Sequence, residues 1–434
     1  MVLSTLAYGT VHQPTLALFY AAISAMVILW ALAGFSSGIF LYSRHPLQLP
    51  LFAAALYALI QMIPFGSISN VAGLADIPRM ISAAPFASEV AAFHFVSLGL
   101  FFSLLLVYID SAGRLQQIVA LITIFGFIYS FYAIIQSMLS PTRIYGIFER
   151  PTPFGSFVNR HNYAAFIEMA LAIPLGMLFA GAVPRDKKLL YITAIAIMGS
   201  SLLLSGSRGG FVAVLAELIL LVILTTRLHG IKAVALKAAL TIALAGAVVA
   251  GAIFVGGETS FSRFADTVGS KDVTTNRLHI WQVTLRVIGA NMPFGAGFGA
   301  FGSAFTPYDD FTGLERVEQA HNDYLQVLAD AGLVGAAIGG FFLFMLIRQC
   351  RRSIVVRNTF RRGLAVGSSV GIAAVLVHSL FDFVLHTTAI SVLFLTLTAL
   401  LVASGRKYPD DVPELEDRRR HRPSSSVASF ARKT

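Results

Sequence analysis

The amino-acid sequence predicts an all-α polytopic membrane protein with about eleven transmembrane helices. Of its 434 residues, 56% are hydrophobic and 12% are charged, whereas a soluble domain usually carries about 25% charged residues. The mean hydropathy is +0.75, and the apolar residues come in blocks of about 18–25, the length that crosses a hydrocarbon core of about 30 Å. Because these blocks lack the alternation of barrel strands, we expect helices, which satisfy their own backbone in lipid.

The apolar blocks define the candidate spans. They are residues 15–41, 47–64, 90–109, 115–139, 163–183, 189–205, 209–226, 232–256, 325–347, 363–381 and 387–404. The first block is long enough to be one helix or two, so a count of twelve stays open. We treat 1–404 as one transmembrane domain and expect the Ser-, Pro- and charge-rich tail 405–434 to be disordered.

Lysine and arginine residues gather in alternate short loops, after the first, third, fifth, seventh and ninth blocks and in the tail. This is the positive-inside pattern, which predicts that these loops and the C-terminus are cytoplasmic. The net charge of +10 therefore reflects membrane orientation, and we expect no nucleic-acid partner. The single cysteine, Cys350, excludes an internal disulfide and a cysteine-rich metal site.

The opposite loops include a long one, residues 257–324, which is expected to contain short helices. The pattern of residues 274–288 predicts an amphipathic helix. Its expected N-cap is Thr274 or Thr275. Its expected apolar face consists of Leu278, Trp281, Leu285 and Ile288. Further along, Gly297–Gly302 matches the GxGxxG dinucleotide pattern. That motif needs a strand before it and a helix after it, so we interpret the glycines as tight turns with room for a ligand.

Three polar features on this side are candidates for chemistry. Arg208 lies between two apolar blocks, where an arginine costs about 2.5–3.5 kcal/mol on insertion scales; it either grips an anion with two parallel hydrogen bonds or snorkels at a helix end. Arg277 lies in the first turn of the amphipathic helix, where the alternative is a solvated surface arginine. His321, just before a span, can exchange a proton near neutral pH, and its alternative is a polar helix cap.

Other polar residues in or beside the apolar blocks are less specific, because each can equally satisfy a neighbouring helix. They are Glu168 and Glu217 inside spans, and His378, Asp382 and His386 around the last outer turn. Intramembrane carboxylates are functional candidates by default. No Asp, Glu and His residues share a convincing metal-ligand spacing, so the sequence predicts no metal site.

At these residues the chain resembles the O-antigen ligase and polymerase superfamily of bacterial envelope glycosyltransferases. The segments that carry the resemblance are Phe154–Asn162, Ser205–Phe211, Asn276–Trp281, Pro293–Gly302 and His321–Gly335. Family ligases are described with twelve spans and both ends inside. The prediction of eleven spans with the N-terminus outside departs from that description at the N-terminal end.

The resemblance implies a function. Such enzymes move a glycan from undecaprenyl diphosphate to an acceptor hydroxyl on the periplasmic face of the bacterial inner membrane, with no nucleotide sugar, obligatory metal or cofactor. The acceptor is lipid A-core in ligases and a second lipid-linked glycan in polymerases. We expect the ligase type. The first alternative is an O-antigen or exopolysaccharide polymerase, and the second is a lipid-linked glycan transporter.

The resemblance also implies roles for residues. By position, Arg208, Arg277 and His321 match the residues that the family uses for diphosphate recognition and catalysis. The arginines would stabilise charge on the leaving diphosphate, and the histidine would deprotonate the attacking hydroxyl, with inversion at the anomeric carbon. The further expected substrate contacts are Arg160, Asn322, Asp323, Trp281 and Arg143.

Overall fold

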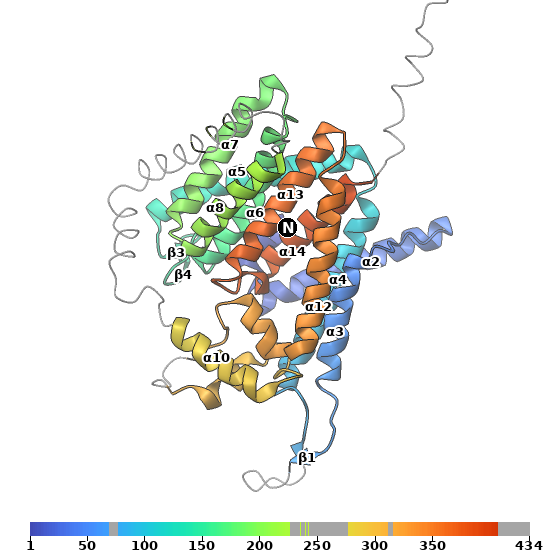
Figure 1. Cartoon of the computed structure of the whole chain (residues 1–434), viewed down its shortest axis with the longest axis vertical. Helices are drawn as coiled ribbons and strands as arrows, with labels where there is room; N and C mark the ends of the chain where they lie inside the picture. Colours follow the sequence, from blue (N-terminus) through green and yellow to red (C-terminus); the bar gives the residue numbers. More distant parts are fainter. Residues whose placement is uncertain are drawn as a thin grey trace, which may run out of the picture.

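The computed structural model describes residues 1–68, 77–225, 277–310 and 316–406, together with the isolated positions 235, 239 and 242. Most of this part of the chain is helical, and the long helices form a bundle (Figure 1). Two small antiparallel hairpins stand beside it. They are β1 (Ser67–Ile68) with β2 (Ile77–Pro78), and β3 (Arg143–Ile144) with β4 (Phe148–Glu149). The predicted all-α character is therefore confirmed.

Within the described ranges, eight helices are long and apolar enough to cross a membrane. They are α2 (Gln13–Ser37), α4 (Pro85–Tyr108), α5 (Ala112–Leu139), α6 (Arg160–Phe179), α7 (Lys188–Leu204) with the preceding turn η3 (Arg185–Lys187), α8 (Arg208–Thr225), α12 (Asp323–Ser353) and α13 (Thr359–His378). The shorter apolar helices are α3 (Leu49–Ile60) with the turn η2 (Pro46–Gln48), and α14 (Thr388–Ser404).

These helices fall on the predicted spans, with boundaries that differ by a few residues. The first apolar block is a single continuous helix, α2, which follows the short α1 (Val2–Leu6) and η1 (Tyr8–Thr10). The predicted span 232–256 lies outside the described residues, apart from isolated positions, and so does the tail from residue 407. The total of eleven spans and the disorder of the tail consequently stay predictions.

A close backbone contact joins α6 and α13. A Cβ on Gly176 of α6 would lie only 2.4 Å from the Cα of Gly367 on α13, so the two backbones touch. Small residues allow such close approach where lipid supplies little hydrophobic drive between helices. Both helices are mainly buried, with 89% and 72% of their apolar windows inside the protein, whereas the value for α2 is 6%. They form the buried centre of the bundle, and Arg160 and His161 lie at the start of α6.

A second, smaller core lies at the end of the bundle where α12 begins. It joins α12 to α10 (Arg277–Asn291) and α11 (Phe301–Phe305), and α11 continues into the exposed turn η4 (Thr306–Tyr308). The predicted apolar face of α10 was wrong in part. Leu278 and Leu285 are 55% and 58% exposed, whereas Ile280, Val283 and Val287 pack inward. The helix carries apolar residues on two sides, and the side with the β-branched residues Ile280, Val283 and Val287 is the one that packs against the protein.

The Gly-rich loop after α10 forms the predicted tight turns, since Gly295, Gly297 and Gly299 all have positive φ. It leaves no room for a ligand at two of them. A Cβ on Gly295 would lie 2.4 Å from the backbone of α12, and one on Gly297 would meet Ser82 at the same distance. The expected ligand space is therefore filled by backbone and by a side chain.

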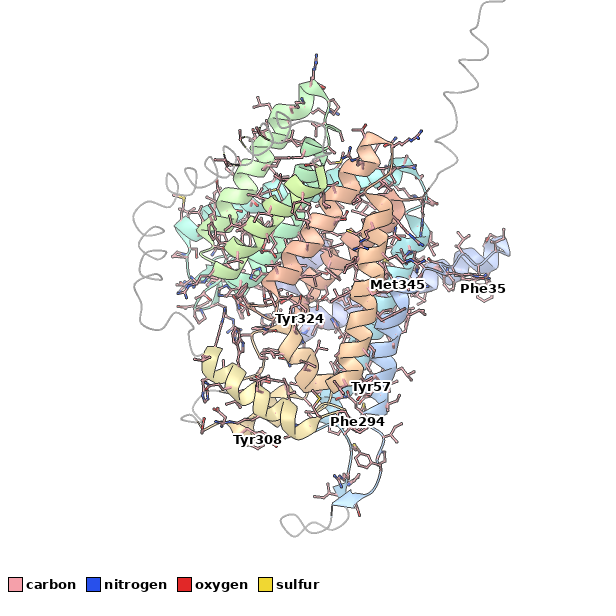
Figure 2. The ribbon with its side chains drawn as sticks, viewed as in Figure 1. Phe35, Tyr57, Phe294, Tyr308, Tyr324 and Met345 are labelled. Carbon is pink, nitrogen blue, oxygen red and sulfur yellow. The ribbon has the colours of Figure 1, made fainter. Side chains whose placement is uncertain are left out.

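The loop packs where α12 is interrupted, at Gly332, whose φ of 56° and ψ of −145° are not helical. The backbone N–H groups of Ala296 and Leu333 donate to Ala329 and Pro293 across the break, at 2.8 and 2.9 Å. Tyr57 of α3 adds a hydrogen bond to the Phe294 carbonyl, and the two labelled residues lie beside each other in Figure 2. The break joins the small core firmly to the bundle.

Candidate functional site

The candidate site is organised around one buried carboxylate, Asp382, in the turn between α13 and η5 (Val384–His386). Its side chain is 2% exposed and accepts from three directions. His321 Nδ1 lies 3.0 Å from Oδ1, Arg277 Nη2 donates to Oδ2 at 3.1 Å, and the Phe383 backbone N–H donates to Oδ1 at 2.9 Å. Asp382 thus joins two predicted residues that are 44 positions apart in the chain.

His321 is oriented as a proton acceptor requires. Its backbone has a φ of 50°, in the left-handed region that non-glycine residues rarely adopt. The Nδ1 atom of His321 is hydrogen-bonded to the carboxylate of Asp382, and no residue that the structure describes makes a hydrogen bond to Nε2. The side chain is 31% exposed. A carboxylate at Nδ1 favours the tautomer in which Nε2 carries the lone pair, so this nitrogen can accept a proton from a substrate.

Asn322 has a clear structural role, since its Oδ1 accepts from the backbone N–H groups of Tyr324 and Leu325 and caps α12. Its Nδ2 donates to the Leu380 carbonyl at 3.0 Å. This cap fixes the start of α12 against the turn that carries Asp382. The polar-cap interpretation therefore holds for Asn322, while His321, just before it, is free to face the site.

Helix α10 supplies Arg277 and also Trp281 one turn further on. The indole N–H of Trp281 donates to the Ala320 carbonyl at 3.0 Å, and Ala320 N–H donates to Gln326 Oε1 at 2.7 Å. Trp281 was predicted to contact substrate. Its described contact is instead to the backbone immediately before His321, which suits a residue that positions the histidine.

The hinge Ser205–Gly210 approaches the same carboxylate through His161, the second residue of α6. His161 Nδ1 lies 2.9 Å from Ser207 Oγ and 3.9 Å from Asp382 Oδ2. Arg208 begins α8 one residue later, and a Cβ on Gly206 would lie 3.6 Å from Arg160 Nη1. The starts of α6 and α8 therefore bring Arg160 and Arg208 to the side of the site where Asp382 holds Arg277.

The electrostatics of the cluster are set by this excess of basic groups. Burial alone would raise the pKa of Asp382, but the His321 hydrogen bond and the charges of His161 and Arg277 outweigh it and hold that pKa well below its usual value. The charges of Arg277 and Arg160 both act on His161. An ionised Asp382 offsets the charge of Arg277, and Arg160 adds a further positive charge beside His161, which favours a bound anion on this side of the cluster.

Two predicted substrate contacts are not joined to His321 by any contact among the described residues. Arg143 lies in the β3–β4 hairpin, 56% exposed, and pairs with Glu149 at 3.7 Å. Asp323 turns away to His386, whose Nδ1 lies 2.8 Å from its Oδ1. Arg143 therefore has a local ion pair, and Asp323 belongs to a second histidine–carboxylate pair.

One group in the described residues has metal-ligand geometry, although the sequence spacing did not indicate it. The ligand atoms of His279, Asp309 and Asp310 all lie within 4.8 Å of one another. Its members are already paired, since His279 Nε2 lies 2.9 Å from Asp309 Oδ1 and Arg286, outside the group, places Nη1 3.4 Å from Asp310 Oδ2. The ligands come from α10 and from the end of η4, some thirty positions apart, so no local motif could reveal them.

Sequence reasoning missed two members of the site. Asp382 was considered only as one of several polar residues at the last outer turn, and His161 only as part of a motif. Both are polar residues beside the ends of buried helices, at the ends away from the basic loops. That shared position is the signal in the sequence, but their distance from His321 along the chain hides the contact.

A bundle of apolar helices in which one buried carboxylate joins a histidine and an arginine defines a multi-pass membrane protein whose clustered ionisable groups are suited to proton transfer and anion binding. A family model described as O-antigen ligase matches residues 193–340, a segment that contains Arg208, Arg277 and His321. Over this part of the chain the match agrees with the predicted resemblance to the O-antigen ligase and polymerase superfamily. A search among curated proteins finds no match.

Proposed function

We propose that this protein is a glycosyltransferase of the O-antigen ligase type, which transfers a glycan from undecaprenyl diphosphate to a hydroxyl of lipid A-core. The observation that carries the proposal is the single buried carboxylate of Asp382, which binds His321 and Arg277 together. Because both side chains contact the same carboxylate, the proton acceptor His321 lies close to the anion-binding Arg277. Transfer from a diphosphate donor needs both groups at the same reacting centre.

The proposed reaction is a direct displacement at the anomeric carbon. The acceptor hydroxyl oxygen forms a bond to C1, while the bond between C1 and the diphosphate oxygen breaks and its electron pair leaves with the diphosphate. The hydroxyl proton passes to Nε2 of His321. Attack from the face opposite the leaving group inverts the configuration at C1.

The arginine side chains are proposed to stabilise the leaving diphosphate. Charge grows on the diphosphate as its bond to C1 breaks, and preorganised guanidinium groups stabilise that charge strongly in a partly dry site. Arg277 is fixed by Asp382, and Arg160 and Arg208 lie at the starts of neighbouring helices. We propose that these residues take the place of a metal ion, so EDTA should leave transfer unchanged.

The proposed setting follows from the charge pattern of the loops. The basic loops and the C-terminus are cytoplasmic, the site opens on the periplasmic face of the inner membrane, and both lipid-linked substrates reach it from the bilayer. Donor and acceptor then share one membrane leaflet, which removes the need for a soluble activated sugar.

Two experiments test the proposal. Purified protein in lipid nanodiscs should join a glycan from an undecaprenyl diphosphate donor to lipid A-core, and counterflow of donor without any acceptor would indicate a transporter instead. In cells, deletion of the gene should remove all glycan-capped lipopolysaccharide. Retention of caps of a single repeat would indicate a polymerase and would contradict the ligase assignment.

Arg277→Gln is expected to raise the KM for the donor about tenfold to a hundredfold, since a hydrogen bond to a charged group contributes about 1.5–3 kcal/mol. Arg277→Lys should recover only part of the loss, because lysine lacks the planar fork. Arg286→Gln is the matched control on the same helix, where the side chain is 54% exposed and faces Asp310. Equal effects at the two positions would exclude a specific role for Arg277.

Trp281→Phe is expected to lower kcat about threefold to tenfold, because it removes one hydrogen bond, worth about 0.5–1.5 kcal/mol, from the backbone before His321. The KM for either substrate should change little. Trp30→Phe is the control, since Trp30 makes the same kind of bond, to the Leu41 carbonyl. If Trp281→Phe changes KM and leaves kcat intact, the residue contacts substrate as first predicted.

A further inference from the structure

The start of α12 and the last outer turn are joined by two crossed histidine–carboxylate pairs. In the first pair the α12 segment supplies His321 and the turn supplies Asp382, at 3.0 Å. In the second the roles are exchanged, with Asp323 from α12 and His386 from the turn, at 2.8 Å. The proposed reaction uses only the first pair, so the second has no assigned role.

The second pair has the same construction as the first. Its carboxylate is buried, with Asp323 8% exposed, and both oxygens are occupied, Oδ1 by His386 and Oδ2 by the Leu385 backbone N–H at 3.1 Å. Its imidazole is 37% exposed. Nδ1 is bound to the carboxylate, and no hydrogen bond from the described residues engages Nε2. A ring held in this way presents one nitrogen to a ligand.

The surroundings of His386 differ from those of His321. His94 of α4 and Asp330 of α12 lie within range of the charge of His386. His94 Nδ1 is itself 3.2 Å from the hydroxyl of Tyr20 on α2. Polar side chains in spanning helices are costly in lipid and usually mark a substrate path. Helix α4 thus places the imidazole of His94 within range of His386, and Tyr20 of α2 contacts that imidazole.

The chemistry of the two neighbourhoods indicates different ligands. The pair at Asp382 is accompanied by arginines, which suit a diphosphate. The pair at Asp323 has the imidazole of His94 and the carboxyl group of Asp330 within range of its charge, and such groups donate and accept single hydrogen bonds and therefore suit sugar hydroxyls. We propose that His386, oriented by Asp323, binds a carbohydrate hydroxyl of the lipid-linked acceptor. Asp323 is then a positioning residue. This inference rests on the proposed transferase function.

The test separates the two substrates kinetically. The purified protein in nanodiscs is assayed with the acceptor varied at saturating donor, and then with the donor varied at saturating acceptor. His386→Ala should raise the acceptor KM about tenfold, the effect of one lost hydrogen bond at the upper end of its range. The donor KM should stay within about twofold. His386→Gln, which keeps an N–H donor, and Asp323→Asn should show smaller rises.

His45→Gln is the matched control. His45 caps η2 and lies near the charge of Arg352, at the end of α12 opposite Asp323, so both KM values should equal those of the wild type. Binding of undecaprenyl diphosphate alone, without transfer, verifies that each variant is folded. If the His386→Ala protein does not fold, the acceptor KM of the His386→Gln and Asp323→Asn proteins tests the inference instead.

The outcomes are distinguishable. An unchanged acceptor KM in a variant that binds undecaprenyl diphosphate, beside an active wild type, overturns the inference and leaves the proposed function standing. A parallel rise of both KM values also overturns it, since that result indicates a general loss of structure. A wild type that neither binds undecaprenyl diphosphate nor transfers overturns the proposed function, and the inference falls with it.

Discussion

Replacing His321 with alanine is expected to abolish glycan transfer, with kcat lowered by about 10²–10⁴, the usual contribution of a positioned general base. Binding of undecaprenyl diphosphate should be retained, because Arg277 keeps its partner Asp382 in this variant. The measurement is single-turnover transfer by the purified protein, beside a direct donor-binding assay. His45→Ala is the control, with wild-type activity. An active His321→Ala protein would contradict the proposed mechanism.

Asp382→Asn distinguishes a base that is oriented by the carboxylate from a base that acts alone. An asparagine keeps the shape of the side chain but loses its charge, and its amide can favour the wrong imidazole tautomer, so kcat should fall by about 10² or more. The donor KM should also rise, since Arg277 loses its ion pair. Asp310→Asn, at an exposed aspartate near α10, should change neither parameter.

The acid dependence of activity should not come from Asp382. Its pKa is lowered in the folded protein, so its contribution to stability is fully present above the unfolded value of about 3.9 and is lost only as the pH falls through the lower folded value. Across a transfer assay between about pH 5 and pH 8 its charge is constant. A loss of wild-type kcat in this range must therefore arise from another group.

The second large effect is expected on stability. Glu168 of α6 and His378 of α13 form a pair that is 0% exposed on both sides, with Oε2 and Nδ1 3.0 Å apart. Removing one partner of a buried pair costs about 3–5 kcal/mol, because the other is left buried without compensation. Glu168→Met should therefore lower the free energy of unfolding by that amount.

The double variant tests whether the two residues act as a pair. Replacing both with apolar residues, Glu168→Met with His378→Leu, should recover most of the stability that either single change loses. Unfolding can be followed by thermal denaturation in a fixed lipid composition. Glu217→Gln is the control, since this carboxylate is also buried and has no hydrogen-bond partner among the described residues. Additive losses in the double variant would show that the contact contributes no coupling.

The pair also connects to the site. The His378 carbonyl accepts the backbone N–H of Asp382 at 3.2 Å, and a Cβ on Gly209 would lie 2.7 Å from His378 Nε2. The imidazole therefore packs against the hinge residue that follows Arg208. A destabilised variant should lose transfer at a lower temperature than it loses its helical signal, because the pair lies beside the ends of α8 and α13 that carry Arg208 and Asp382.

The helices could be predicted from the sequence because each long apolar run is a local property. The charges of the loops likewise indicated which loops share a side of the membrane, and this grouped Arg208, Arg277 and His321. The contacts within the site could not be predicted. Asp382 lies 61 positions after His321, and only the packing of α12 against the last outer turn brings them together.

Two further features show why local patterns are insufficient. The buried face of α10 was mistaken because apolar residues occur on two of its sides, and only the position of α11 and α12 decides which is covered. The close seam between Gly176 and Gly367 was not predicted, since glycines are common throughout the chain and a seam needs matching positions on two helices. Both depend on tertiary packing.

The interruption of α12 at Gly332 has a consequence for how this protein tolerates sequence change. The contacts across the break that join Ala296 to Ala329 and Leu333 to Pro293 run from main chain to main chain, so these hydrogen bonds do not depend on particular side chains. They depend on the absence of side chains at Gly295, Gly297 and Gly332, where an added Cβ would lie 2.4, 2.4 and 2.1 Å from neighbouring atoms. A larger residue at any of these glycines should therefore force the loop, Ser82 or α12 to shift.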